Sequence, residues 1–148
     1  MAVGDIIRTE GLMLMQVTVK ANEDIELGEM VVDDGNGFLA ATAALAALSK
    51  PMVALEAHDY SEASVHTITV GVKGVFEVQK TANNGAIRKG NKLTIDSTAG
   101  EVKVFSMADV TSTVNETNVE NAMLANQAAF GQAYEDVATG ATSVKIIL

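Results

Sequence analysis

The alternation of apolar and polar residues predicts that this chain is mainly β. Its clearest period of two lies near the middle, where one parity is apolar and the other is polar or small. The apolar positions of this strand are Ile68, Val70, Val72, Phe76 and Val78. Gly71 and Gly74 interrupt the strand, which is typical of a bulge or a sharp bend. Apolar runs predict further strands at residues 12–19, 25–32, 92–95, 102–105 and 144–148.

Turn and helix signals lie between these strands. The segments Asp33–Gly37 and Asn83–Gly85 carry the Asp-Gly and Asn-Gly steps that supply positive φ in tight turns. The alanine-rich segment Ala40–Leu48 predicts either a helix of about two turns or a loop over the end of a barrel, and Pro51 ends it. A second short helix is predicted after Asn118, its expected N-cap, through Val119, Ala122, Met123 and Ala125.

The chain also repeats itself once. Five residues recur at one ungapped offset, namely Ala54, Glu56, Ser64, Val65 and Ile68 as Ala133, Glu135, Ser143, Val144 and Ile147. Four more recur upstream, namely Ile25, Gly28, Asp33 and Gly37 as Ile87, Gly90, Asp96 and Gly100. This order predicts one domain over residues 1–148, built from two similar halves. We place an N-terminal arm at 1–11, a first half at 12–70, and a second half at 71–148 with an insertion at about 107–129.

Composition narrows the possible partners. The formal net charge is −9 and the ten basic residues are scattered, which argues against binding to nucleic acid. The chain has no cysteine, so disulfides, thiolate metal sites and a cysteine nucleophile are excluded. No apolar stretch reaches the roughly 18 residues that cross a bilayer, and the first residues do not resemble a signal peptide. We therefore expect no membrane partner, and synthesis in a cytoplasm.

The residues that carry chemistry do not form a catalytic or metal-binding pattern. The turn at Asp33–Gly37 lacks the ligand spacing and flanking helices of an EF-hand calcium loop. His58 and His66 are the two histidines of the chain, and the repeat aligns His66 with Lys145, which predicts a solvated face rather than a metal site. No nucleophile elbow or phosphate-binding loop is present.

Two carboxylates recur in the repeat, and their role is either catalytic or structural. Glu56 and Glu135 occupy matching positions, so a shared structural role, such as accepting turn N–H groups, is favoured over acid–base catalysis. We expect no enzyme activity, no catalytic residue, no cofactor and no metal.

Some apolar segments are candidates for contact with a partner. The arm Ala2–Glu10 is either a first edge strand or, having no evident local partner, a segment ordered by a neighbouring subunit. Met13–Met15 could form a docking surface, although packing in the core is the favoured interpretation. From the arm and the insertion we select Ile6, Ile7, Arg8, Val119 and Met123 as candidate contacts with a partner protein or another subunit.

Six motifs in serial order resemble the capsid cement, or head decoration, proteins of tailed bacteriophages. They are Leu27–Val31, Val53–Glu56, Gly74–Val78, Lys89–Leu93, Asp96–Val102 and Phe130–Glu135, before a turn at Gly140 and a last apolar strand. The resemblance covers the chain from about residue 12, and the insertion at 107–129 departs from it. It implies a mainly β fold, a small β-barrel or β-tulip with one or two short helices, and no enzymatic activity.

The resemblance also implies a function and partners. The protein is expected on the capsid exterior of a virion, bound to the major capsid protein of an HK97-like shell as a homo-oligomer, with a trimer as the expected form. There it reinforces the shell against internal DNA pressure. Alternatives are another virion β module, such as a fibre base or a tail-associated domain, and a carbohydrate-binding domain. The scarcity of aromatic residues, 4% of the chain, disfavours a sugar site.

Overall fold

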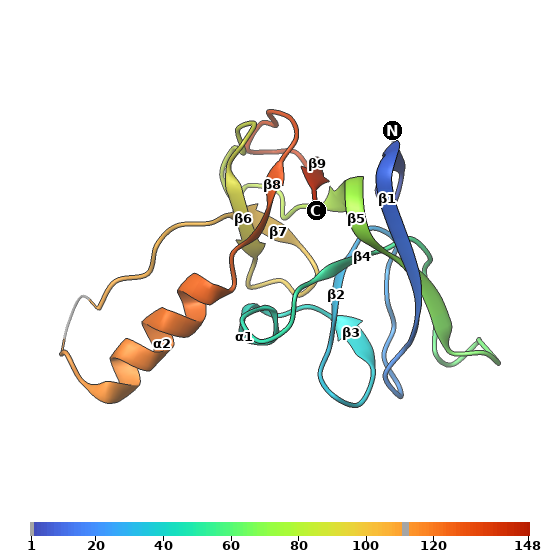
Figure 1. Cartoon of the computed structure of the whole chain (residues 1–148), viewed down its shortest axis with the longest axis horizontal. Helices are drawn as coiled ribbons and strands as arrows, with labels where there is room; N and C mark the ends of the chain where they lie inside the picture. The colour runs from blue at the N-terminus through green and yellow to red at the C-terminus, as the bar shows by residue number, and fades with distance from the viewer. Residues whose placement is uncertain (1, 111–112) are drawn as a thin grey trace.

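The fold is a curled half-barrel sheet with two helices over the described residues, which confirms the prediction of a mainly β chain (Figure 1). The computed structural model describes residues 2–110 and 113–148, and residues 8–10 through their backbone alone. The strands of this part of the chain are β1 (Ile6–Thr18), β2 (Met30–Asp33), β3 (Phe38–Ala40), β4 (Met52–Ala54), β5 (Thr67–Gln79), β6 (Lys92–Ile95), β7 (Val102–Val104), β8 (Phe130–Ala133) and β9 (Ser143–Ile147). The helices are α1 (Ala43–Ala46) and α2 (Glu116–Gln127).

The order of the strands shows the internal repeat. Along the sheet the order is β3-β2-β4-β5-β9-β8-β6-β7, and β1 pairs with β5 outside this path. Each half therefore has the same succession of elements: a hairpin, a segment with a helix, and two further strands. The first half runs β2-β3-α1-β4-β5 and the second runs β6-β7-α2-β8-β9. The named strand pairs are antiparallel.

Backbone hydrogen bonds repeat along with the elements. The N–H of Gly28 donates to the carbonyl of Ala54 at 2.9 Å, and the N–H of Gly90 donates to the carbonyl of Ala133 at 2.8 Å. Bridges between Ile25 and His58 and between Ile87 and Val137 also correspond. The offset that relates Ala54 to Ala133 therefore holds as far as His58 and Val137.

Beyond that point the ungapped alignment of the repeat was wrong. Ala54 pairs with Val70 whereas Ala133 pairs with Ile146, so Val70 is the counterpart of Ile146. The connection between the paired strands is thus three residues longer in the first half. A surface connection tolerates such an insertion at little cost in free energy, because the strands at its two ends keep their pairing. Matching Ser64, Val65 and Ile68 to Ser143, Val144 and Ile147 is therefore incorrect.

β5 bends at its glycines, as the sequence predicted, and the bend lets one strand enter two cores. Gly74 has φ of +142°, and the pairing of β1 with β5 shifts register between Met13 and Leu14, opposite Lys73 and Gly71. Before the bend, Ile68 and Val70 pack in one apolar cluster. After it, Phe76 and Val78 pack in another, so Val72 and Phe76 do not share one continuous buried face.

Neighbouring residues of β2 are also divided between the two clusters. Met30 and Val32 belong to the larger cluster and Val31 to the smaller, and each of the three side chains is fully buried. Both faces of this strand are therefore covered, which is why its apolar residues are consecutive rather than alternating. The predicted strand at 25–32 is correspondingly shortened, since residues 26–29 form the turn that precedes β2.

Side-chain caps define the N-terminal ends of both helices. Thr42 caps α1 by accepting a hydrogen bond from the N–H of Leu45 at 3.3 Å. The helix is one short turn, Ala43–Ala46, rather than the two turns that the alanine-rich segment predicted. Asn115, not Asn118, is the N-cap of α2, and its side chain accepts from the N–H of Asn118 at 2.8 Å. Both asparagines precede the apolar residues of the helix, so composition alone did not distinguish them. Within the described residues, no helix has the length and apolar character needed to cross a membrane.

The turn at Asp33–Gly37 is a structural hairpin turn. The Asp33 carboxylate accepts from the N–H groups of Gly35 and Gly37 at 2.9 and 3.2 Å, and Asp34 forms an ion pair with Lys20. Gly37 has φ of +130°, and a Cβ there would lie 2.7 Å from the backbone of Lys20. In the described part of the chain, histidine, aspartate and glutamate do not form a group of three or more that would suit a metal ion.

We predict that Gly71→Ala destabilises the protein by about 1–3 kcal/mol, as overpacking of a core does. The added Cβ would lie 2.4 Å from the ring of Phe76, which is fully buried and cannot move aside freely. Urea denaturation measures the change. Gly140→Ala is the matched control, because its Cβ meets open space and its φ is ordinary for an L-residue. Equal stability of the two variants would contradict this account of the bend.

Candidate interaction surfaces

The first candidate surface is helix α2, which lies beside the sheet on the side away from β1 (Figure 1). None of its residues is buried. Its partly covered line consists of Asn118, Ala122 and Asn126, one turn apart. Asn126 makes two hydrogen bonds with the backbone of Ala108, at 2.7 and 3.2 Å, and so ties the helix to the segment that precedes it. An isolated helix of this length is marginally stable in water, because helices in proteins owe most of their stability to packing.

Two predicted contact residues lie on the exposed part of α2. Met123 is 55% exposed and Val119 is 38% exposed. The structure adds Leu124, which is exposed beside them and shares a shallow pocket with Glu120, Met123 and Gln127. We call Val119, Met123 and Leu124 the α2 patch. Sequence reasoning missed Leu124 because the helix is not amphipathic, so the spacing of its apolar residues did not indicate which of them face solvent.

The N-terminal arm has a partner within its own chain. Ile6 pairs with Phe76 of β5, and the N–H of Gly4 donates to the carbonyl of Glu77 at 2.7 Å. The segment from Ile6 is therefore part of an edge strand, the alternative that the sequence left open, and the other alternative for Ala2–Glu10, a segment without a local partner, was wrong. Ile6 is exposed and Ile7 is half-buried. The side chain of Arg8 lies outside the described residues.

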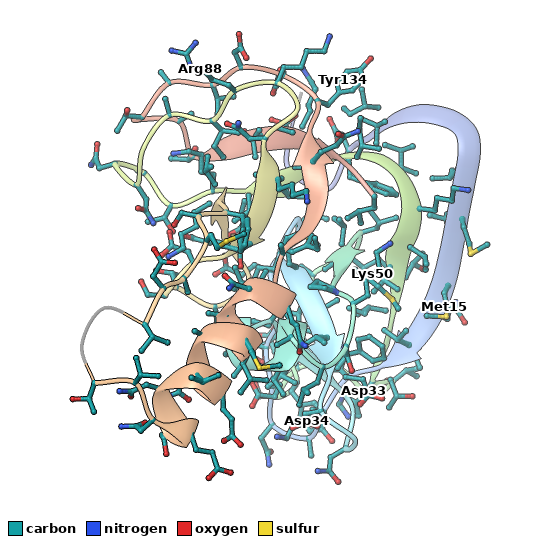
Figure 2. All side chains as sticks on the ribbon, turned by 60° about the vertical axis from the view of Figure 1, so that its left-hand side comes forward. Met15, Asp33, Asp34, Lys50, Arg88 and Tyr134 are labelled. Atoms are coloured by element: carbon teal, nitrogen blue, oxygen red, sulfur yellow. The ribbon has the colours of Figure 1, made fainter. Side chains whose placement is uncertain are left out.

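The second candidate surface is the apolar run of β1, which was expected in the core. Met13, Leu14 and Met15 are 55%, 44% and 40% exposed. Figure 2 shows Met15 at the outer side of β1, away from α2. The correction follows from position in the sheet: among the described residues, no element covers the side chains of this stretch of β1, so they meet solvent. We call Met13–Met15 the β1 ridge.

The histidines lie together in the connection between β4 and β5. His58 Nε2 and His66 Nδ1 are 3.0 Å apart, and the ring of His66 stacks on Tyr60 with centroids 3.8 Å apart. His58 is buried. The alignment of His66 with Lys145 was wrong, because the counterpart of Lys145 is Thr69. His66 itself is half-buried.

The recurring glutamates have the same structural role in each half. The Glu56 carboxylate accepts from the hydroxyl of Thr69 at 2.7 Å. Glu135 accepts from the N–H of Lys145 and pairs with its ammonium, both at 3.1 Å. Thr69 and Lys145 are counterparts, so each glutamate joins its loop to the strand that follows. The bonds go to strand residues rather than to the turn N–H groups that were proposed.

Two buried charged residues, Lys80 and Asp96, lie near the end of β5. Lys80 is 2% exposed, and its ammonium donates to the carbonyls of Thr81 and Thr139 at 3.0 and 3.1 Å. Burial lowers the pKa of Lys80, while the nearby Asp96 carboxylate acts in the opposite direction. The charge thus joins loops from both halves of the chain. The sequence did not predict this role, because a single lysine after a strand is usually exposed.

Asp96 is the carboxylate of this group. It is also buried, and burial by itself would raise the pKa of its carboxyl. Hydrogen bonds from the side chains of Asn84 and Ser97 favour the carboxylate and hold the pKa below its usual range. Asp96 therefore contributes its stabilisation in the ionised form.

Comparison with known proteins gives a fold neighbour and no sequence family. No protein-family model and no curated protein matches the chain. Among solved structures, the chain is similar to the N base of head fiber gp8.5 of bacteriophage phi29, with a TM-score of 0.51 and 15% identity. The similarity covers 92% of this chain and 94% of that chain. At this identity the likeness shows a shared fold.

We predict that Asp96 makes the stability of the protein depend on acid. Because its folded-state pKa is lowered, its contribution is complete above the unfolded value of about 3.9 and is lost as the pH falls through the folded value. Asp96→Asn should therefore reduce the free energy of unfolding more at pH 7 than at pH 3, measured by urea denaturation. The exposed Asp109 provides the control variant Asp109→Asn. A loss that is the same at both pH values would contradict the prediction.

Proposed function

We propose that this chain is a structural module of a bacteriophage virion that attaches to the outside of the head. The observation that supports this most is the shared fold, which spans nearly the whole of this chain and of a protein described as the base of a phage head fibre. The motifs that resemble head decoration proteins are independent of that similarity, since they were identified in the sequence alone.

The α2 patch supports an attachment role. A helix that buries none of its own side chains gains little stability from the sheet, yet it presents Val119, Met123 and Leu124 to solvent. Burial of such residues against a partner releases water from apolar surface and stabilises both the helix and the complex. We assign this surface to contact with the shell, with the major capsid protein of an HK97-like head as the proposed partner. The role is one of binding, and no residue has a catalytic part in it.

Two versions of this role differ in what the protein carries. As a decoration protein it would bridge neighbouring capsid subunits, where many weak contacts act together, and so resist internal DNA pressure. As a fibre base it would anchor a further component to the head. The fold neighbour favours the second version, since it is itself a fibre base. The motif resemblance favours the first.

Cosedimentation of the purified protein with phage heads that lack it tests the attachment shared by both versions. Expanded heads and unexpanded precursor heads are compared in parallel. We expect saturable binding to expanded heads at a fixed number of copies per capsomer. If neither type of head binds the protein, the proposal fails and a tail or ligand-binding role takes its place.

Resistance of the loaded heads to heat then distinguishes the two versions. A decoration protein should raise the temperature at which packaged heads release DNA, because it joins neighbouring capsid subunits. A fibre base should bind without that increase. DNA release is followed with an intercalating dye on heads with and without the protein.

We predict that Met123→Asp weakens binding to expanded heads by about tenfold or more, the effect of losing an apolar contact at the centre of an interface. Met123 is exposed on α2, so the substitution should leave the fold intact. The control is Val65→Asp, which also places a carboxylate at an exposed apolar residue, 67% exposed, but lies outside α2. Equal binding by the two variants would show that the α2 patch does not contact the shell.

A further inference from the structure

The two halves of the chain meet at a contact to which both contribute backbone groups. The N–H of Gln79 donates to the carbonyl of Gly28 at 3.0 Å, and the N–H of Met30 donates to the carbonyl of Gly100 at 2.8 Å. The first half thus contributes the turn before β2 and the start of that strand. The second half contributes the end of β5 and the turn between β6 and β7.

The second half has the same turn before β6, and there the turn is uncovered. Gly90 is the counterpart of Gly28 through their repeated hydrogen bonds, so Lys92 is the counterpart of Met30. Gly28 and Met30 are buried, whereas Gly90 and Lys92 are exposed. A Cβ at Gly28 would lie 2.5 Å from Val3, but one at Gly90 would meet nothing within 4 Å among the described residues. The side that joins the first half to the second is therefore left open on the second half.

The uncovered turn is basic. Arg88, Lys89 and Lys92 are exposed, and within the described residues none of the three forms an ion pair. The Lys89 ammonium lies 5.9 Å from the centroid of the Tyr134 ring. In the first half, Glu26 stands at the position that matches Arg88, so the repeat keeps the turn and reverses its charge. We call Arg88, Lys89 and Lys92 the basic turn.

The first half also has a counterpart of the surface that receives this kind of turn. Val19 follows β1 and is bridged to Phe38, just as Lys80 follows β5 and is bridged to Val102, both in the parallel sense. The end of β1 is therefore equivalent to the end of β5. The turn between β2 and β3 is likewise equivalent to the turn between β6 and β7, which takes part in the contact between the halves.

This part of the first half is acidic. The first 70 residues include eleven acidic and three basic residues, so they carry nearly all of the net charge of −9. Asp33 and Asp34 lie at the turn between β2 and β3, and Asp34 pairs with Lys20. Glu23 lies beside them, since its N–H donates to the carbonyl of Lys20 at 3.2 Å. We call Glu23, Asp33 and Asp34 the acidic end. Figure 2 shows Asp33 and Asp34 at the end of the molecule opposite Arg88.

We propose that copies of this chain associate head to tail, with the basic turn of one copy against the acidic end of the next. The contact repeats between chains the arrangement that joins the halves within a chain. Opposite charges at opposite ends do not meet within one molecule, but they attract one another across two. Such a contact joins two different surfaces, so it can continue from copy to copy or close into a ring. The inference does not depend on the proposed function.

The mass of the free protein, measured by sedimentation velocity over a range of concentrations, tests this association. Because exposed charges are screened by salt, we expect association at an ionic strength of about 0.02 M and a dissociation constant at least about tenfold higher at about 0.5 M.

Two variants with reversed charge identify the surfaces that meet. Arg88→Glu with Lys92→Glu makes the basic turn acidic, and Glu23→Lys with Asn36→Lys makes the acidic end basic. Each variant alone then places like charges against each other, which should raise its dissociation constant about tenfold or more. A mixture of the two should associate again, because every contact between unlike variants has opposite charges.

The matched control is Lys50→Glu with Lys73→Glu, which changes the net charge as much as the first variant does, at exposed residues outside both surfaces. It should associate like the unchanged chain. Circular dichroism and thermal unfolding first establish that each variant is folded. A protein that is monomeric at every concentration overturns the proposal, and so does association that the reversals leave unchanged. An equal loss in the control, or a mixture that stays apart, overturns it as well.

Discussion

The bend of β5 is the constraint on which the rest of this structure depends. A ring stacked over Gly71 and a positive φ at Gly74 turn one strand from the smaller apolar cluster into the larger. The two halves of the sheet follow from that turn, because β4 pairs with β5 before it and β9 pairs with β5 after it. Without the bend, a single long strand would offer its apolar side chains to one face, and the two halves would not share it.

Two groups of exposed apolar residues, the α2 patch and the β1 ridge, lie at separate places on the molecule. The α2 patch belongs to a helix that buries none of its own residues, and the β1 ridge belongs to a strand whose side chains at residues 13–15 are exposed. An aliphatic chain with strong net negative charge can tolerate such residues while remaining soluble, because charge opposes unspecific association.

Local patterns predicted several elements correctly. The strand at residues 92–95, the glycine bend and the hairpin turn at residues 33–37 were identified because each has its signal within a few residues. Burial was harder to predict. The apolar run of Met13–Met15 has the composition of a core strand, but whether a strand is covered depends on elements distant in sequence. Lys80 is the opposite case, a charged residue that is buried. The carbonyl of Thr139, far along the chain, accepts a hydrogen bond from its ammonium and so offsets the cost of removing the charge from water.

The sequence by itself determined the β character of the chain, the positions of its turns and the presence of two related halves, because these follow from side-chain period and glycine placement. The tertiary structure alone decided how the halves align after Ala54 and Ala133, where a loop differs in length while strand pairing is preserved. It also decided which apolar residues remain exposed. Pairing and burial are relations between distant segments, and no local pattern contains both partners.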